Sequence, residues 1–313
     1  MKAKVEKTNK DGFVYEIKKN RELYMMCIPA LLVLVLFCYI PLVGNYMAFT
    51  DFNVVDGIFG SEFVGLKNFK YFFSKNSIGL KVTWNTLYIN LWGLVLGLIV
   101  PIALAIFLNE IRMKTLKKVT QSMMFFPYFL SWVIVGAIIY GFFSTDIGVV
   151  NNVLRSMGKE GISWYAEPKY WKGIIIFANV WKWSGYNSIV YMSTMANFDF
   201  SLYEAAKVDG ASRFQQIRYL TIPMLKPTAV VLTLMAIGRI FYGDFGMIYG
   251  VIGNNPMLLD ETSVIDTYVY QAMRTLGFSY STAVGLMQSV MGLILITIAN
   301  KYAKKINEGE GLF

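Results

Sequence analysis

The sequence predicts an all-α polytopic membrane protein with six transmembrane helices. Of its 313 residues, 56% are hydrophobic and 16% are charged, which is too little charge to cover a soluble surface. Six apolar stretches approach or exceed the roughly 20 residues that cross a bilayer as a helix. Lysine and arginine concentrate in alternate connecting segments, which is typical of the cytoplasmic side of a multi-pass protein.

The N-terminal part of the chain predicts a cytoplasmic tail and a first span. Residues 1–22 are polar and lysine-rich, whereas residues 23–50 contain no charged side chain. This apolar run is too long for a cleaved signal peptide, and no small-residue cleavage site ends it. Cys27 and Cys38 lie eleven residues apart, about 16 Å along a helix, so we expect packing roles and no disulfide between them.

The other five predicted spans alternate with loops. Pro101 lies within the second span, where we expect a kink, because neighbouring helices can satisfy the freed carbonyl. Tryptophans and tyrosines cluster in the second external loop, as they do at membrane interfaces. The spans are residues 83–108, 122–143, 173–198, 227–245 and 278–300, and the external loops are residues 51–81, 146–172 and 246–277.

The distribution of positive charge predicts that both termini are cytoplasmic. The segments placed inside hold 18 lysines and arginines, and the external loops hold 9. The net charge of +9 would also suit a nucleic-acid-binding protein, but in a membrane protein basic residues more often mark the inner side.

A polar segment, residues 201–223, follows the fourth span and predicts two short cytoplasmic helices. Ser201 with Glu204, and Ser212 with Gln215, have the spacing of capping boxes. Gly210 between them can adopt the left-handed conformation that ends a helix, and Pro223 cannot donate to a continuing one. Two helices around a glycine would also fit a DNA-reading helix-turn-helix, but a segment held against a membrane is poorly placed to reach a duplex.

This segment resembles the EAA signature of the membrane subunits of bacterial ABC importers. The matching residues are Glu204, Ala205, Ala206, Gly210 and Pro223, with Leu220 and Ile222 as conservative departures. The resemblance extends over residues 20–305, and residues 265–271 and 278–289 are similar to the oligosaccharide and polysaccharide subgroup of the carbohydrate uptake type. It implies that residues 201–223 form a cytoplasmic coupling helix that docks into the ATPase.

The resemblance also implies the organisation and the partners. Residues 23–305 would form the permease domain between cytoplasmic tails at residues 1–22 and 306–313, in a bacterial cell membrane. Partners would be a second homologous permease subunit, two ATP-binding subunits, and an external solute-binding protein that delivers a sugar. The alternative is a membrane scaffold that transports nothing and recruits a cytoplasmic partner through residues 201–223.

We expect no catalysis, metal or cofactor in this chain. It has no histidine, no serine elbow and no phosphate-binding G-x-x-x-x-G-K-[ST] motif; residues 60–67 come closest, with Leu66 in place of the lysine. ATP hydrolysis would therefore fall to partner subunits.

The predicted substrate path lies mainly on the fourth and fifth spans. Aromatic rings stack on sugar faces, and polar tips bind hydroxyls, so the fourth span indicates a sugar path. Ionisable residues within a membrane are costly unless they pair or face an aqueous cavity. Ordinary interfacial aromatics with a snorkelling Lys182 remain the alternative. The candidates are Trp181, Trp183, Tyr186, Asn187, Tyr191, Arg239, Asp244 and Asn90.

Overall fold

The computed structural model describes residues 13–74 and 78–306, and in this part the chain is almost entirely helical. Two strands of two residues, β1 (Thr50–Asp51) and β2 (Glu62–Phe63), pair antiparallel with Thr50 opposite Phe63. The predicted all-α class is confirmed. Residues 1–12 and 307–313, which make up most of the two predicted tails, lie outside the described residues.

Within residues 13–74 and 78–306, four helices are long and apolar enough to cross a membrane, or up to five if one bent pair counts as a span, by length and composition. They overlap five of the six predicted spans. The remaining predicted span, the fourth, corresponds to α9 (Trp171–Ala196). This helix has 26 residues and is long enough to cross a membrane, but its polar side chains lower its hydropathy. The count of six spans therefore stays a prediction. The candidates are Arg21–Phe49, Gly79–Glu110, Arg213–Gly238 and Phe278–Lys304, and the bent pair joins Lys114–Phe129 to Trp132–Phe143.

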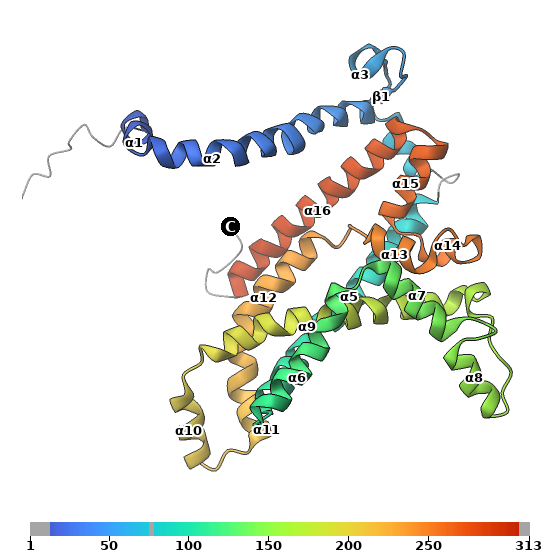
Figure 1. Cartoon of the computed structure of the whole chain (residues 1–313). Helices are drawn as coiled ribbons and strands as arrows, with labels where there is room; N and C mark the ends of the chain where they lie inside the picture. The colour runs from blue at the N-terminus through green and yellow to red at the C-terminus, as the bar shows by residue number, and fades with distance from the viewer. Residues whose placement is uncertain (1–12, 75–77, 307–313) are drawn as a thin grey trace, which may run out of the picture.

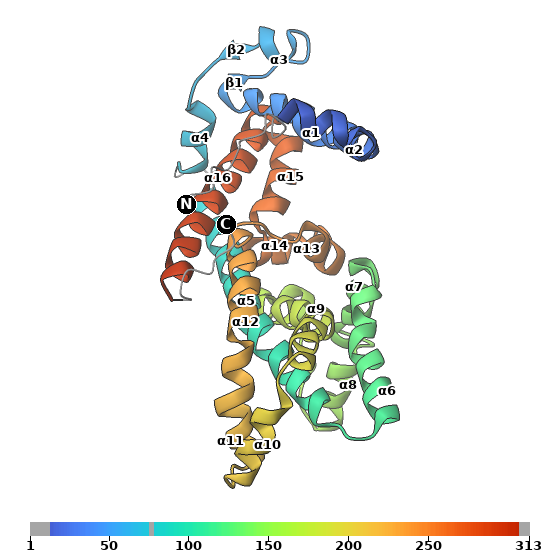
Figure 2. The ribbon, with the colours of Figure 1, turned by 90° about the vertical axis from the view of Figure 1, so that its left-hand side faces the viewer.

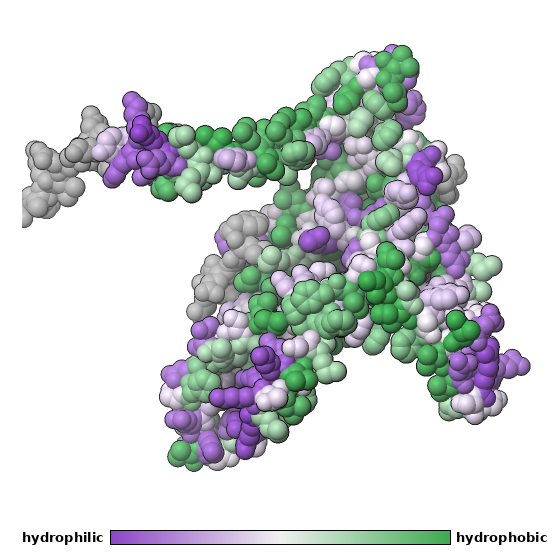
Figure 3. Space-filling view, viewed as in Figure 1, coloured by the Kyte–Doolittle hydropathy of each residue, from purple (hydrophilic) through white to green (hydrophobic). Residues whose placement is uncertain are grey.

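The first span projects from the body of the molecule (Figure 1). It follows α1 (Phe13–Lys19) and consists of α2 (Arg21–Leu34), a π turn η1 (Val35–Tyr39) and a 3-10 segment η2 (Ile40–Phe49). None of its most apolar 18-residue window is buried, and Figure 3 shows hydrophobic side chains along it. Its last part, η2, packs on the last helix.

The two cysteines on this span are unpaired, as expected. Cys27 and Cys38 are both free and exposed.

Two more short helices, α3 (Gly57–Gly60) and α4 (Lys67–Phe72), lie in the first predicted external loop. The second span, α5 (Gly79–Glu110), runs without interruption through Pro101 and packs along α9.

The third span differs from the prediction. Helix α6 (Lys114–Phe125) begins before the predicted span 122–143, so Lys114, Lys117 and Lys118 lie on a helix rather than in a loop between the second and third spans. The chain then turns through η3 (Phe126–Phe129) and continues as α7 (Trp132–Phe143) at 103° to the first part. Pro127, at the start of η3, cannot donate a backbone hydrogen bond and so favours a break at this point.

The second predicted external loop contains α8 (Val149–Ser156) and two 3-10 turns, η4 (Trp164–Ala166) and η5 (Pro168–Tyr170). It leads into α9, whose first residue, Trp171, is completely buried. The largest hydrophobic cluster joins α5, α7, α9 and α13 (Phe245–Ile252), so these helices form the core of the described chain.

The predicted polar segment forms α10 (Phe200–Val208), α11 (Arg213–Gln216) and a π turn, η6 (Ile217–Thr221). The predicted stop at Pro223 is wrong, because the chain continues directly into α12 (Ile222–Gly238). In the π turn the N–H of Ile222 bonds the carbonyl of Ile217, five residues back, and Pro223 then stands in the first turn of α12, where its missing N–H is tolerated.

The predicted fifth span, residues 227–245, is also corrected. The helix ends at Gly238, and residues 239–244 are not helical before α13 begins. Asp244 caps α13 through its side chain, which favours a helix start there rather than a continuous span. The predicted third external loop is mostly helical, with α14 (Pro256–Thr262) and α15 (Ile265–Thr275) before the last helix, α16 (Phe278–Ile306).

Two glycines allow backbones to touch at the centre of the fold. A Cβ on Gly185 of α9 would lie 1.8 Å from the carbonyl oxygen of Met124 in α6, and one on Gly136 of α7 would lie 2.0 Å from that of Gly250 in α13. Small residues at such contacts are typical of packed transmembrane helices.

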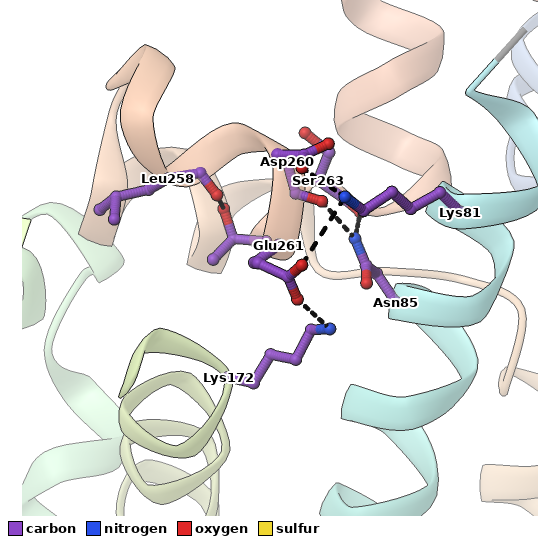
Figure 4. Close-up of polar contacts among 8 residues, drawn as sticks. Lys81, Asn85, Lys172, Leu258, Asp260, Glu261 and Ser263 are labelled. Carbon is purple, nitrogen blue, oxygen red and sulfur yellow. Dashed lines mark hydrogen bonds and ion pairs between the residues drawn. The ribbon is translucent and has the colours of Figure 1, made fainter. Parts of the chain in front are cut away.

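Ion pairs join α14 to the starts of α5 and α9 (Figure 4). Lys172 pairs with Glu261 at 2.5 Å, and Lys81 contacts Asp260 and lies 3.6 Å from Glu261. The hydrogen bond from Lys172 is the main reason that the pKa of Glu261 lies below its ordinary value. Asn85 of α5 donates to the carbonyls of Asp260 and Ser263, so polar contacts fix the position of α14.

Candidate functional site

A cavity of about 730 Å³ opens between α5, α9, α12 and the non-helical residues 239–244. Its volume lies within the range of small-molecule sites in proteins. Six of the eight side chains predicted for the substrate path line it: Asn90, Trp183, Asn187, Tyr191, Arg239 and Asp244.

Trp181 and Tyr186 are not among the residues that line this cavity. Tyr186 stacks on Tyr128 of the bent third span, with ring centroids 4.5 Å apart and planes 14° from parallel. Trp181 is 39% exposed. The structure therefore brings part of the aromatic group to the cavity and leaves these two rings on other faces of α9.

Lys182 does not snorkel to an interface, so the part of the alternative that concerns this lysine is wrong. The side chain is buried, and its ammonium donates to the carbonyls of Pro127, Tyr128 and Leu130 at 3.4, 2.8 and 2.5 Å. These carbonyls belong to the break between α6 and α7. A lysine from α9 thus satisfies the backbone groups that the bend leaves without helical partners.

The non-helical segment at the cavity is held by side chains from three other helices. Asn90 of α5 donates to the carbonyls of Ile240 and Tyr242 at 2.7 and 2.9 Å. Gln288 of α16 donates to the carbonyl of Phe241 at 2.7 Å, and the carboxylate of Asp266 of α15 accepts from the N–H of Gly243 at 2.5 Å. These hydrogen bonds pair backbone groups of residues 240–243 that have no helical partners, and they fix the conformation of the segment.

Sequence reasoning missed Gln288 and Asp266. They lie in residues 265–271 and 278–289, whose pattern indicated only a family subgroup. For Gln288, a polar side chain inside a predicted span was the available signal. Asp266 lies in the predicted third external loop, where a carboxylate is ordinary and gave no signal. Asn90, which was predicted for the substrate path, lines the cavity, but its amide donates to the backbone.

Asp244 also has protein partners at the cavity. Its two carboxylate oxygens accept from the indole N–H of Trp132, at 2.8 Å, and from the N–H of Met247, at 2.9 Å. Arg239 is exposed, and within the described residues no carboxylate forms an ion pair with it. Arg239 and Asp244 therefore form no ion pair with each other in this part of the chain, and both line the cavity.

The segment after α9 presents a defined surface at the opposite end of the molecule from β1 and β2 (Figures 1 and 2). Gly210 has φ +80°, and Ser212 and Gln215 form a capping box, as predicted. Gln216 donates to the carbonyl of Ala211, and the hydroxyls of Tyr203 and Thr221 lie 2.9 Å apart, so α10 is tied to the helix that follows it.

The predicted capping box of Ser201 and Glu204 is wrong. Helix α10 begins two residues earlier than predicted, at Phe200, and Asp199 is its cap, with the side chain accepting from the N–H of Ser201. This hydrogen bond is the main cause that lowers the pKa of Asp199. An aspartate is as good an N-cap as a serine, so the sequence was compatible with a helix capped by either Asp199 or Ser201.

Exposed apolar side chains cover this end of the molecule. Leu202, Val208 and Phe214 are 46%, 87% and 69% exposed, and Ala205 is also exposed. A second cavity of about 290 Å³ lies between this segment and the end of α5, and its lining includes Glu204, Lys207, Arg213 and Glu110.

Comparisons with known proteins agree on one family. Residues 97–308 match the family described as "Binding-protein-dependent transport system inner membrane component". The chain is 37% identical to Protein LplB of Bacillus subtilis (strain 168), over 95% of this chain and 92% of that protein. It is 35% identical to the polygalacturonan/rhamnogalacturonan transport system permease protein YteP of the same organism, over 98% of this chain and 95% of that protein.

A solved structure is similar over nearly the whole chain. It is a chain of a bacterial alginate ABC transporter in complex with an alginate pentasaccharide-bound periplasmic protein. The TM-score is 0.87 at 30% identity, and the match covers 96% of this chain and 99% of that one.

Proposed function

The chain belongs to the family of binding-protein-dependent transport system inner membrane components, and we propose that it forms half of a translocation path for a sugar oligomer. The resemblance drawn from residues 201–223 is thereby confirmed at the level of the family. The observation that carries the proposal is the cavity, which combines aromatic rings, amides and charged groups within a membrane protein of this family. The scaffold alternative has no observation in its favour.

The groups in the cavity suit a carbohydrate. The ring of Trp183 can stack on the apolar face of a sugar, and the amides of Asn179 and Asn187 can bond hydroxyls. Similar proteins carry names that refer to acidic polysaccharides and to neutral sugars, among them arabinooligosaccharides and lactose. We therefore assign a sugar oligomer as the substrate.

We propose that α10, Gly210 and α11 form the coupling element that docks on a partner ATPase. Two observations support this proposal. The surface around Ala205 is apolar and exposed, and the turn at Gly210 sets the angle between α10 and α11. The hydrogen bonds of Gln216 and Tyr203 hold these helices in place. The complete transporter would also contain a second permease subunit, two ATPase subunits and an external binding protein. We further propose six spans, with α9 as the fourth and both termini cytoplasmic.

The test is reconstitution of the complete transporter in vesicles, with uptake of a labelled oligosaccharide and ATPase activity measured together. We expect uptake that requires ATP and the binding protein. Gly210→Leu should strain the turn by about 1 kcal/mol or more and re-aim α10 and α11, so stimulation of the ATPase by loaded binding protein should be lost.

Gly158→Leu is the matched control, because Gly158 also has a positive φ (+74°) and open space around its Cα but lies in the second predicted external loop. It should keep coupling at equal membrane levels. If Gly210→Leu behaved like Gly158→Leu, docking through α10 and α11 would be rejected. Reporter fusions within residues 201–222 should report cytoplasm, and fusions at Gly161 and Asp260 the exterior.

A further inference from the structure

Three ionisable side chains other than tyrosines line the 730 Å³ cavity: Arg239, Asp244 and Asp266. The two carboxylates both have protein donors. Asp244 accepts from Trp132 and Met247, as described above, and Asp266 accepts from the N–H of Gly243 and, at 3.1 Å, from the amide of Gln288. Their hydrogen-bonding oxygens are thus directed to the protein rather than to a solute.

Arg239 differs from both carboxylates. It is the C-cap residue of α12, its side chain is exposed, and within the described residues it has no ion pair. A guanidinium at membrane depth is costly unless an aqueous cavity or an anion compensates it. Its planar array of five N–H donors matches a carboxylate in two parallel hydrogen bonds.

The segment that carries Arg239 is held in place rather than loose. The hydrogen bonds from Asn90 and Gln288, and the one to Asp266, fix residues 240–243 immediately after it. A cation on such a support keeps its direction when no ligand is present, which lowers the entropic cost of binding.

We infer that the cavity recognises oligosaccharides that carry carboxylates, such as hexuronate oligomers, and that Arg239 is the group that binds the carboxylate. This inference rests on the proposed transport function and selects one substrate class within it. Trp183 and the amides of Asn179 and Asn187 contact parts that acidic and neutral sugars share, so Arg239 sets the preference between them.

The experiment uses the complete transporter in vesicles and three labelled probes: trigalacturonate, its trimethyl ester and neutral galactotriose. The ester keeps the shape of the acid and removes its charge. Arg239→Gln should lower uptake of the free acid about 10- to 100-fold relative to the ester, as expected for loss of hydrogen bonds to a charged group. Arg239→Lys keeps the charge without the planar array and should retain more acid uptake than Arg239→Gln.

Arg274→Gln is the matched control, since this guanidinium lies over the ring of Tyr270, 6.0 Å from its centroid, and is not among the cavity residues. It should transport the acid as the unchanged protein does, with membrane levels measured in parallel.

The outcomes separate the inference from the proposed function. Uptake of galactotriose but not trigalacturonate by the unchanged transporter would overturn the inference and leave the proposed function intact. An equal fall for acid and ester in Arg239→Gln, or no difference between Arg239→Gln and Arg274→Gln, would also overturn the inference. No ATP-dependent uptake of any of the three probes would overturn both.

Discussion

Replacing Lys182 by methionine tests whether the bend in the third span depends on a cation from α9. Methionine retains the apolar stem but removes the donor to three carbonyls, two of which lie 2.8 and 2.5 Å from the ammonium. Hydrogen bonds to charged groups contribute about 1.5–3 kcal/mol each. The two short bonds therefore bring the gross loss to roughly 3–6 kcal/mol. In bilayers the unfolded chain also finds partners, and measured values are smaller, so we expect a net loss of about 2–3 kcal/mol.

The assay is unfolding of the purified transporter by a denaturing detergent, followed by tryptophan fluorescence, for the unchanged protein and Lys182→Met. Lys169→Met is the control, because Lys169 forms an exposed pair with Glu167, and exposed pairs contribute little. We expect Lys169→Met to stay within about 0.5 kcal/mol of the unchanged protein. A similar value for Lys182→Met would refute the reasoning, since the bend would then hold without the lysine.

Three further predictions follow from the described contacts, two of them with a control substitution. Gly185→Ala should cost about 1–3 kcal/mol in the same assay, because its Cβ meets a backbone carbonyl, whereas Gly173→Ala in the same helix has open space and should be close to neutral. Asp199→Ala should destabilise α10 and raise the protease susceptibility of this segment, and Ser201→Ala should do so much less; equal effects would contradict the assignment of the cap. Glu261→Gln should lose up to about 1 kcal/mol at pH 7. Because the pKa of Glu261 is lowered in the folded protein, this difference should be complete above about pH 5 and disappear as the pH falls through the folded pKa. No difference between the two proteins at pH 7 would argue against the ion pair.

The helical class and most span positions could be predicted because they depend on local properties of the sequence. Runs without charge, such as residues 23–50, satisfy the length and hydropathy that a bilayer requires. The turn at Gly210 and the cap at Ser212 were also predictable, since both depend on residues within one or two turns.

The breaks in the spans could not be predicted from local signals such as Pro127 alone, because the side chains that support them come from distant residues. The bend after α6 is supported by Lys182, more than 50 positions away, and residues 239–244 are held by Asn90 and Gln288. Pro223 misled the prediction for a different, local reason. A π turn directly before it places this proline at a helix start, where a proline is tolerated.

The candidate site was predictable in composition but not in arrangement. Trp183 and Asn187, four residues apart on one helix, both line the cavity, whereas Tyr186, between them in sequence, stacks on Tyr128. The partners of Asp244 come from α7 and α13, and no spacing in the sequence indicates the first of them.

The most apolar part of the first span, Arg21–Phe49, is not covered by the rest of the described chain. The substitutions that it tolerates would therefore report what surrounds it. No residue of its most apolar window is buried by the rest of the chain, so in the isolated subunit every face of that window should accept any apolar residue equally and reject charge equally. A neighbour on one side imposes a size restriction that recurs about every 3.6 residues. Saturation mutagenesis of residues 23–34 in the assembled transporter would therefore map a contact face, and the phase of that pattern would identify which side of α2 is covered.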